Sequence, residues 1–265
     1  MGATSMNPSL DLEPHGADTY VGSSPDCPWG RIYGCLVVGQ ALTAATATVD
    51  PEHHVHSLHA YFILGGVPSE PVRYEVDRIR NGRMFSTRRV VARQSGGAIL
   101  NLSASFHRVE GGYEVEGVEL PDAPSPDSVQ PSQWEVGMDY REVEPPPSPG
   151  RSLAWARYRA PLPDDPRIHA CALAFLSDAN PMDAIAGLHP IKPSSPDEWG
   201  ATYVSASLDH AIWFHRQVRA DEWLLFDMCS PHIGGGRGVA RGEVFQHGRL
   251  VATVAQEGLL RLRTR

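Results

Sequence analysis

The chain of 265 residues predicts an α+β fold, with one structural unit built twice in tandem. Two observations lead to this prediction. A proline-rich segment, with eight prolines from Pro121 to Pro149, divides the chain into two parts of roughly equal length. Each part then shows the same order of patterns: an alanine-rich apolar stretch, a short strand, and longer strands separated by glycine turns.

The first element of each part is predicted to be a buried helix. Residues 31–49 read RIYGCLVVGQALTAATATV, and residues 165–185 read DPRIHACALAFLSDANPMDAI. Both stretches are apolar over much of the helical circumference, which is typical of a helix enclosed on several sides. Small side chains such as Ala41 and Ala172 would let a sheet approach each helix closely.

The second element of each part is a short strand with a shared opening. It reads HSLHAYFIL in the first part and ASLDHAIWF in the second, and an offset of 150 residues places His59 over Asp209. Asp209 therefore stands at the head of an apolar strand. A carboxylate buried without partners is so unfavourable that it indicates either a paired structural site or chemistry. The difference between His59 and Asp209 favours one working site and one degenerate site.

Strand-rich sequence completes each part, and the turn signals SGG at 95–97 and HG at 247–248 split it into hairpins. A curved antiparallel sheet wrapped around one apolar helix is the hotdog arrangement, expected here twice. A single hotdog leaves a sheet edge exposed, so a tandem repeat supplies its own partner. We expect an N-terminal segment (1–17), a first hotdog repeat (18–113), an extended proline-rich linker (114–150) and a second hotdog repeat (151–265).

Composition excludes several classes of function. A net charge of -8 argues against nucleic-acid partners and anionic membrane surfaces, because no basic stripe is available to release counterions. No apolar run approaches the length of a membrane span, and the N-terminus lacks a signal-peptide pattern. The four cysteines are far apart and form no Cys-x-x-Cys, so we expect neither disulfides nor zinc, and a cytoplasmic location.

Five spaced segments resemble the acyl-CoA thioesterase II family of double-hotdog enzymes. They read SSPDCPWGRIYGCLVVGQALTAA, HSLHAYFILGG, GRMFSTRRVVARQ, SLDHAIWFHR and VAQEGLLR, and they occur in family order from about Asp18 to Arg263. The resemblance implies hydrolysis of acyl-CoA thioesters to free fatty acid and coenzyme A, with no cofactor. It also suggests further association of double hotdogs into a homo-oligomer.

The family's catalytic group is an aspartate, a serine or threonine and a glutamine, all from the second repeat. Carried over by motif, these are Asp209, Ser230 and Gln256. An acid, an alcohol and an amide are suited to hold and deprotonate one water molecule beside a thioester. Each residue also has a structural alternative: Asp209 could pair with an arginine, Ser230 could belong to a turn, and Gln256 could face solvent on its strand.

Substrate contacts are expected from residues of both repeats. Gly234 and Gly235, in the run GGGRG, could let the backbone approach the pantetheine or acyl chain, although a flexible turn explains them equally well. Arg88 belongs to a group of arginines that could meet coenzyme A phosphates, or could lie on a solvated strand face. His59 is the remaining candidate, at the position aligned with Asp209.

Other readings are weaker. The histidines between His53 and His59 are dense enough to suggest a metal, but no carboxylate or cysteine lies at helical spacing, so we expect hydrogen-bonded histidines and no metal site. The absence of Gly-x-Ser-x-Gly argues against a serine hydrolase. A hotdog hydratase acting through His210, or a non-catalytic acyl-CoA-binding module, remains an alternative function.

Two departures from the family pattern occur in the first repeat. The usual Gly-Gly-Gln before the first helix is Gly34-Cys35-Leu36, and the usual arginine-proline after the first short strand is Leu64-Gly65. Both bear on substrate preference more than on the type of reaction, because the three residues of the second repeat are present.

Overall fold

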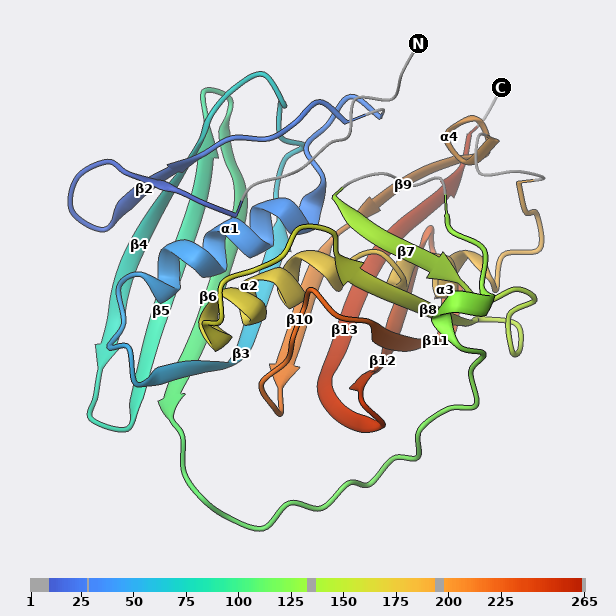
Figure 1. The fold of residues 1–265 in the computed structure, drawn as a ribbon. Helices are drawn as coiled ribbons and strands as arrows, with labels where there is room; N and C mark the ends of the chain where they lie inside the picture. The colour runs from blue at the N-terminus through green and yellow to red at the C-terminus, as the bar shows by residue number, and fades with distance from the viewer. Residues whose placement is uncertain (1–9, 28, 133–136, 194–197, 264–265) are drawn as a thin grey trace.

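A single antiparallel sheet runs through the whole molecule and curves around two central helices, as the computed structural model shows (Figure 1). The structure describes residues 10–27, 29–132, 137–193 and 198–263. The sheet has 13 strands, and helices α1 and α2 pack against each other on its inner face. The prediction of an α+β double hotdog is confirmed.

The elements of the first half are β1 (Glu13–Pro14), β2 (Thr19–Gly22), α1 (Gly34–Thr46), β3 (His53–Phe62), β4 (Val72–Asn81), β5 (Phe85–Gln94) and β6 (Gly97–Arg108). A short 3-10 helix, η1 (Pro126–Ser128), follows. The elements of the second half are β7 (Met138–Glu142), β8 (Arg151–Tyr158), α2 (Pro166–Leu176), α3 (Pro181–Ala186), α4 (Trp199–Thr202), β9 (Tyr203–Ser207), β10 (Asp209–Phe214), β11 (Leu224–Gly234), β12 (Arg237–Gln246) and β13 (Arg249–Leu262).

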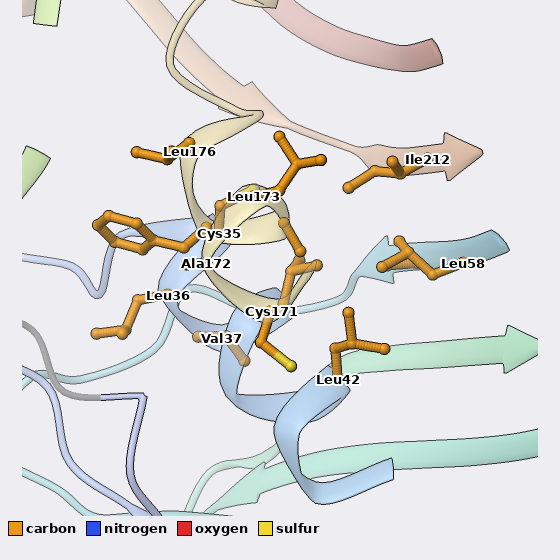
Figure 2. Close-up of a cluster of buried hydrophobic side chains, with 14 of the residues drawn as sticks. Cys35, Leu36, Val37, Leu42, Leu58, Cys171, Ala172, Leu173, Leu176 and Ile212 are labelled. Atoms are coloured by element: carbon orange, nitrogen blue, oxygen red, sulfur yellow. The ribbon is translucent and has the colours of Figure 1, made fainter. Parts of the chain in front are cut away.

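The two halves join at β3 and β10. The strand order is β1-β2-β4-β5-β6-β3-β10-β13-β12-β11-β8-β7, with β9 paired to β13. At the join, Leu58 of β3 lies opposite Ile212 of β10. Both side chains are fully buried beneath residues of α1 and α2, as Figure 2 shows. The apolar core is therefore continuous across the two halves.

The alanine-rich stretches form helices, but the second stretch is broken. Helix α2 starts where the Asp165 side chain accepts a hydrogen bond from the Arg167 N–H and Pro166 occupies the first turn. It ends at Leu176, whereas the sequence pattern predicted one apolar stretch through residue 185. Pro181 cannot continue a helix from the preceding residues, and it opens α3 instead. The break places the polar residues Ser177, Asp178 and Asn180 inside the molecule.

The pairing of the strands matches residues of the two halves at a different spacing from the one that aligns their sequence motifs. Arg88 lies opposite Ala104 in the first half, and Ala240 lies opposite Gln256 in the second, a spacing of 152 residues in both cases (88 to 240 and 104 to 256). An offset of 150 residues aligns the two sequence motifs, HSLHAYFIL and ASLDHAIWF, but the paired strands of the two halves align at 152. By register, the counterpart of Asp209 is Ser57 rather than His59.

The linker follows the outer face of the second half. The Trp155 indole N–H donates to Pro124 O at 3.0 Å, and Glu114 pairs with Arg216 and Arg249. The segment expected to be linker also contributes strand β7, which pairs with β8 at the edge of the sheet. Within the described residues, no helix is long and apolar enough to cross a bilayer.

Candidate active site

A group of polar side chains is buried where the start of α1 meets the end of α2 and the strands β9, β10 and β13. We call it the Gln256 cluster. Its members are Cys35, Ser177, Asp178, Ser207, His210 and Gln256. All of them except Ser207 are almost completely buried.

Strand alternation explains why two of these side chains point inward. On β10, His210 and Ile212 are buried while their neighbours are more exposed, and on β13 the buried face includes Val254 and Gln256. A sheet face covered by helices buries every second residue, whether apolar or polar. Asp178 comes from the break between α2 and α3, which turns a carboxylate toward the same point.

Asp178 is the acceptor at the centre of the cluster. Its Oδ1 accepts hydrogen bonds from Gln256 Nε2 at 2.7 Å and from Ser207 Oγ at 2.8 Å. Gln256 Nε2 also donates to Ser207 Oγ at 3.0 Å. Burial raises the pKa of Asp178, although His210 and the hydrogen bonds from Ser207, Gln256 and Cys35 oppose that shift.

His210 links the amide to the end of α2. Its Nδ1 lies 2.5 Å from Gln256 Oε1, and its Nε2 lies 2.7 Å from Ser177 Oγ. Burial lowers the pKa of His210, which favours the neutral ring. The Cys35 thiol has a pKa well above its ordinary value, because it is buried and lies beside Asp178. A thiol held in the protonated form is a poor nucleophile.

The start of α1 offers free N–H groups beside the cluster. Among the described residues, Leu36 is the first of the helix to form a backbone hydrogen bond through its N–H, to Tyr33 O at 3.1 Å. Gly34 and Cys35 thus present the unpaired donors that begin every helix. A Cβ on Gly34 would lie 2.9 Å from the Phe62 ring and 3.2 Å from Asp178 Oδ2, so the backbone approaches both groups closely.

The three predicted catalytic residues lie on β10, β11 and β13 of the second half. Gln256 is in the cluster. Asp209 is half-buried, and its Oδ1 accepts a hydrogen bond from the N–H of Glu257 at 2.7 Å. Among the described residues, no hydrogen bond joins the Asp209, Ser230 and Gln256 side chains directly.

Ser230 lies on the inner face of β11. Its hydroxyl donates to His232 O at 3.4 Å, next to an irregularity in the β11–β12 pairing. One strand separates it from Gln256, and the residue of that strand opposite Gln256 is Ala240. Ala240 is therefore the residue of β12 that lies between the strands of the alcohol and the amide, and its side chain is small.

The four residues expected to contact substrate lie in different parts of the structure. His59 is exposed on the outer face of the sheet, with its ring 5.2 Å from that of Trp213. Gly234 ends β11, and Gly235 lies in the β11–β12 turn, where Gly235 and Gly236 adopt φ of 59° and 75°. Two consecutive positive φ values require glycine in a tight hairpin, so turn geometry accounts for the glycine run.

Arg88 faces inward and is 1% exposed. Its five N–H groups all have partners, which are the oxygen atoms of Thr48, Arg80, Asn81 and Thr87. In this arrangement no N–H group of Arg88 is left to donate to a coenzyme A phosphate. Arg88 is the register counterpart of Ala240, so a large side chain in the first half corresponds to a small one in the second.

Metal binding is not favoured by this geometry. Among the described residues, the one group with suitable ligand atoms is Cys35, Asp178 and His210, whose atoms lie within 4.8 Å of one another. Both ring nitrogens of His210 already contact Gln256 and Ser177, so the ring has no lone pair directed at a cation. In the histidine-rich segment, His53 and His56 contact the oxygen atoms of Arg83 and Ser105, as expected.

Sequence reasoning missed Asp178, Ser177 and Ser207 as members of the site. One signal was present, because the stretch ALAFLSDAN carries serine, aspartate and asparagine immediately after a fully apolar helical segment. Polar residues in such a place are either a solvated helix end or a buried site. Only the packing of α3 over the sheet decides between these two readings.

A double hotdog with buried carboxylates and a carboxamide beside a helix N-terminus is compatible with thioester hydrolysis. Comparison with known proteins agrees. The model for the acyl-CoA thioesterase N-terminal domain matches residues 23–107, and that for the C-terminal domain matches residues 116–260. The chain therefore belongs to the acyl-CoA thioesterase family and is a thioester hydrolase.

Individual relatives extend over nearly the whole chain. Human acyl-coenzyme A thioesterase 8 is 33% identical, over 96% of this chain and 88% of its own length. Acyl-CoA thioesterase 2 of Haemophilus influenzae is 31% identical, over 91% of each protein. The crystal structure of acyl-CoA thioesterase II TesB2 from Mycobacterium marinum is 41% identical, with a TM-score of 0.82 over 96% of this chain and 97% of that one.

Proposed function

We propose that this protein hydrolyses acyl-CoA thioesters to free fatty acid and coenzyme A, with water as the nucleophile and no metal or organic cofactor. The observation that supports it best is the buried Gln256 cluster beside the free N–H groups of α1. A thioester has weak resonance stabilisation and a good leaving group. Its hydrolysis therefore chiefly needs an oriented water and a stabilised oxyanion.

Asp209, Gln256 and Ser230 are the groups proposed to hold the water. Among the described residues, the second carboxylate oxygen of Asp209 has no hydrogen-bond partner, so it is free to accept a proton. The water oxygen attacks the carbonyl carbon as Asp209 takes its proton. The C–S bond then breaks, and that proton passes to the departing thiolate.

The oxyanion is proposed to be stabilised by the first N–H groups of α1, at Gly34 and Cys35. These donors point out of the helix N-terminus, where the helix dipole also favours negative charge. This role depends on backbone atoms, so it tolerates Cys35 in place of the usual glycine. The high pKa of the Cys35 thiol argues against covalent catalysis by that residue.

The hydratase alternative receives less support. It needs a histidine with a ring nitrogen free to exchange protons with the acyl chain. His210 is 1% exposed, and both of its nitrogens have protein partners.

Thiol release from short-, medium- and long-chain acyl-CoAs tests the proposal, with enoyl absorbance followed in parallel. Hydrolysis predicts thiol release by the wild-type protein and a loss of about 10²-fold or more in Asp209→Asn. Asp77→Asn, which removes an exposed carboxylate paired with Arg89, is the matched control and should retain full activity. Enoyl consumption without thiol would establish the hydratase instead, and binding without either reaction would establish the acyl-CoA-binding module.

A cytoplasmic location and a homo-oligomer complete the proposal. The described cysteines are all free, which suits a reducing compartment. The outer face near the β3–β10 join carries Tyr61 and Trp213, which are 65% and 38% exposed. Exposed aromatic side chains of this kind favour burial against a second copy. Light scattering of the purified protein should give a mass above that of one chain.

A further inference from the structure

We propose that Asp178 and His210 are positioning residues that hold the Gln256 amide in one orientation. In that orientation Gln256 acts on the water only through Oε1, as a hydrogen-bond acceptor. This inference rests on the proposed hydrolysis and adds two residues to it. Neither residue contacts the water in this account, because both act through Gln256.

Asp178 determines which end of the amide faces it. The hydrogen-bond donors Ser207, Gln256 and Cys35 around Asp178 favour its ionised form against the effect of burial. In that form the carboxylate only accepts hydrogen bonds, and its Oδ1 atom lies 2.7 Å from the Gln256 amide. The opposite orientation would place the carbonyl oxygen of Gln256 against that carboxylate, with both groups about 1% to 7% exposed. Two acceptors in contact without water are strongly unfavourable, so the NH₂ group must face Asp178.

Both N–H bonds of Gln256 Nε2 are then occupied. One points to Asp178 Oδ1, and the other points to Ser207 Oγ at 3.0 Å. The Ser207 hydroxyl in turn donates to Asp178, which closes a three-membered ring of hydrogen bonds. Gln256 consequently has no donor left for an oxyanion. That task falls to other groups, such as the helix N–H groups of α1.

His210 fixes the other end of the amide. Gln256 Oε1 only accepts, so His210 Nδ1 at 2.5 Å must carry the hydrogen. In the neutral ring Nε2 is then an acceptor, so the single hydroxyl hydrogen of Ser177 lies toward Nε2 at 2.7 Å rather than toward Ala174 O at 2.9 Å. One lone pair of Oε1 receives the His210 hydrogen, and the second remains for a water molecule near Asp209.

The first half lacks the whole arrangement. At the register spacing of 152, Leu58 replaces His210 and Ala104 replaces Gln256 (58 to 210 and 104 to 256). Thr48, two residues after the end of α1, takes the place that Asp178 has after α2. Acid, histidine and amide are present together in one half and replaced together in the other. This is the pattern expected of groups that work as one unit.

A double-mutant cycle on thiol release tests the inference. Gln256→Ala should lower kcat by about 10²-fold, and Asp178→Ala by about tenfold or more, while KM changes less than about threefold. The double variant should match Gln256→Ala to within about threefold, because Asp178 has nothing left to position. Losses that multiply, or wild-type kcat in Asp178→Ala, would overturn the inference.

An isosteric exchange guards against misfolding as an explanation. Gln256→Glu should lose activity because two carboxylates would then meet inside the cluster. Adding Asp178→Asn exchanges the positions of the amide and the acid, so that one carboxylate and one amide face each other again. The double variant should have a kcat at least about tenfold higher than that of Gln256→Glu. No recovery, in a double variant whose circular dichroism matches the wild type, would refute the positioning role. A wild-type protein that releases no thiol would overturn the proposed function and this inference together, whereas an active enzyme with multiplicative losses overturns only the inference.

Discussion

Arg88 shows how far one residue can depart from its expected role. The pair Arg88-Arg89 suggested phosphate contacts or a solvated strand face. Strand alternation sends the two side chains to opposite faces, so Arg89 pairs with Asp77 in solvent while Arg88 is buried among neutral oxygen atoms. Residue type alone does not tell which face of a strand is covered.

Replacement of Arg88 should destabilise the fold. Arg88→Met leaves Thr48 O, Arg80 O and Asn81 Oδ1 without their donor. We expect the free energy of unfolding to fall by about 3 kcal/mol, since a buried acceptor without a partner costs about 1–3 kcal/mol. Urea unfolding measures it, with Arg89→Met as the control, where the loss of an exposed pair should cost less than about 1 kcal/mol. Equal midpoints for the two variants would contradict this reading of Arg88.

Some individual residues of the candidate site could be predicted from the sequence. Gln256 was found from its motif, and the structure places it among buried polar groups. Asp178 was not found, because its sequence neighbours fit a solvated helix end equally well. The decisive information is non-local: α3 and the strands must pack before the carboxylate is buried. Ser207 was present in the quoted motif but was read only as an alignment marker.

At the scale of elements, hydrophobic pattern predicted the helices, short strands and hairpin turns in the right order. It did not predict the break between α2 and α3, since alanine-rich sequence continues on both sides of it. Nor did it predict β7, because proline-rich surroundings masked a strand at the edge of the sheet. Edges and breaks depend on neighbours that lie elsewhere in the sequence.

The start of α1 should tolerate no side chain at Gly34. Gly34→Ala places a Cβ against the Phe62 ring and Asp178 Oδ2, so one of these groups must move. A shift of this kind beside the reacting atoms should lower kcat by roughly 10- to 100-fold. Gly96→Ala, in the β5–β6 turn with open space around it, is the control and should keep wild-type kcat. Steady-state thiol release decides between these outcomes, and an unchanged Gly34→Ala enzyme would exclude this end of α1 from the site.

Helix α3 carries a carboxyl group that should make stability depend on pH. Asp183 accepts a hydrogen bond from the Tyr140 hydroxyl at 3.1 Å, and burial together with nearby Glu142 raises its pKa well above the ordinary value. The folded protein therefore binds this proton more tightly than the unfolded chain, whose aspartate pKa is about 3.9. The resulting stabilisation is complete below that pH and is lost as pH rises through the raised pKa.

Urea unfolding at several pH values compares the wild type with Asp183→Asn. The free energy of unfolding of the wild type, relative to the variant, should fall steadily between about pH 4 and neutrality. A relative stability that rises with pH over this range would mean that Asp183 is stabilised as the carboxylate, contrary to the structure.

At the scale of the whole molecule, two hotdogs share one sheet and one core, and the proposed site takes most of its side chains from the second half. The tandem organisation followed from the repeated pattern of the sequence. The register between the repeats could not be predicted, because the sequence motifs align at a spacing of 150 residues and the paired strands at 152 (88 to 240). That difference changes the counterpart of Asp209. His59 lies on the outer face because it alternates with the buried Leu58 and Ala60 on β3.

One comparison tests the claim that a single site in the second half hydrolyses the thioester. Thiol release from acyl-CoA is measured for the wild type, Gln256→Ala and His59→Ala. The account predicts a loss of about 10²-fold in Gln256→Ala and activity within about twofold of wild type in His59→Ala, whose ring lies on the outer face against Trp213. Wild-type turnover in Gln256→Ala would contradict it.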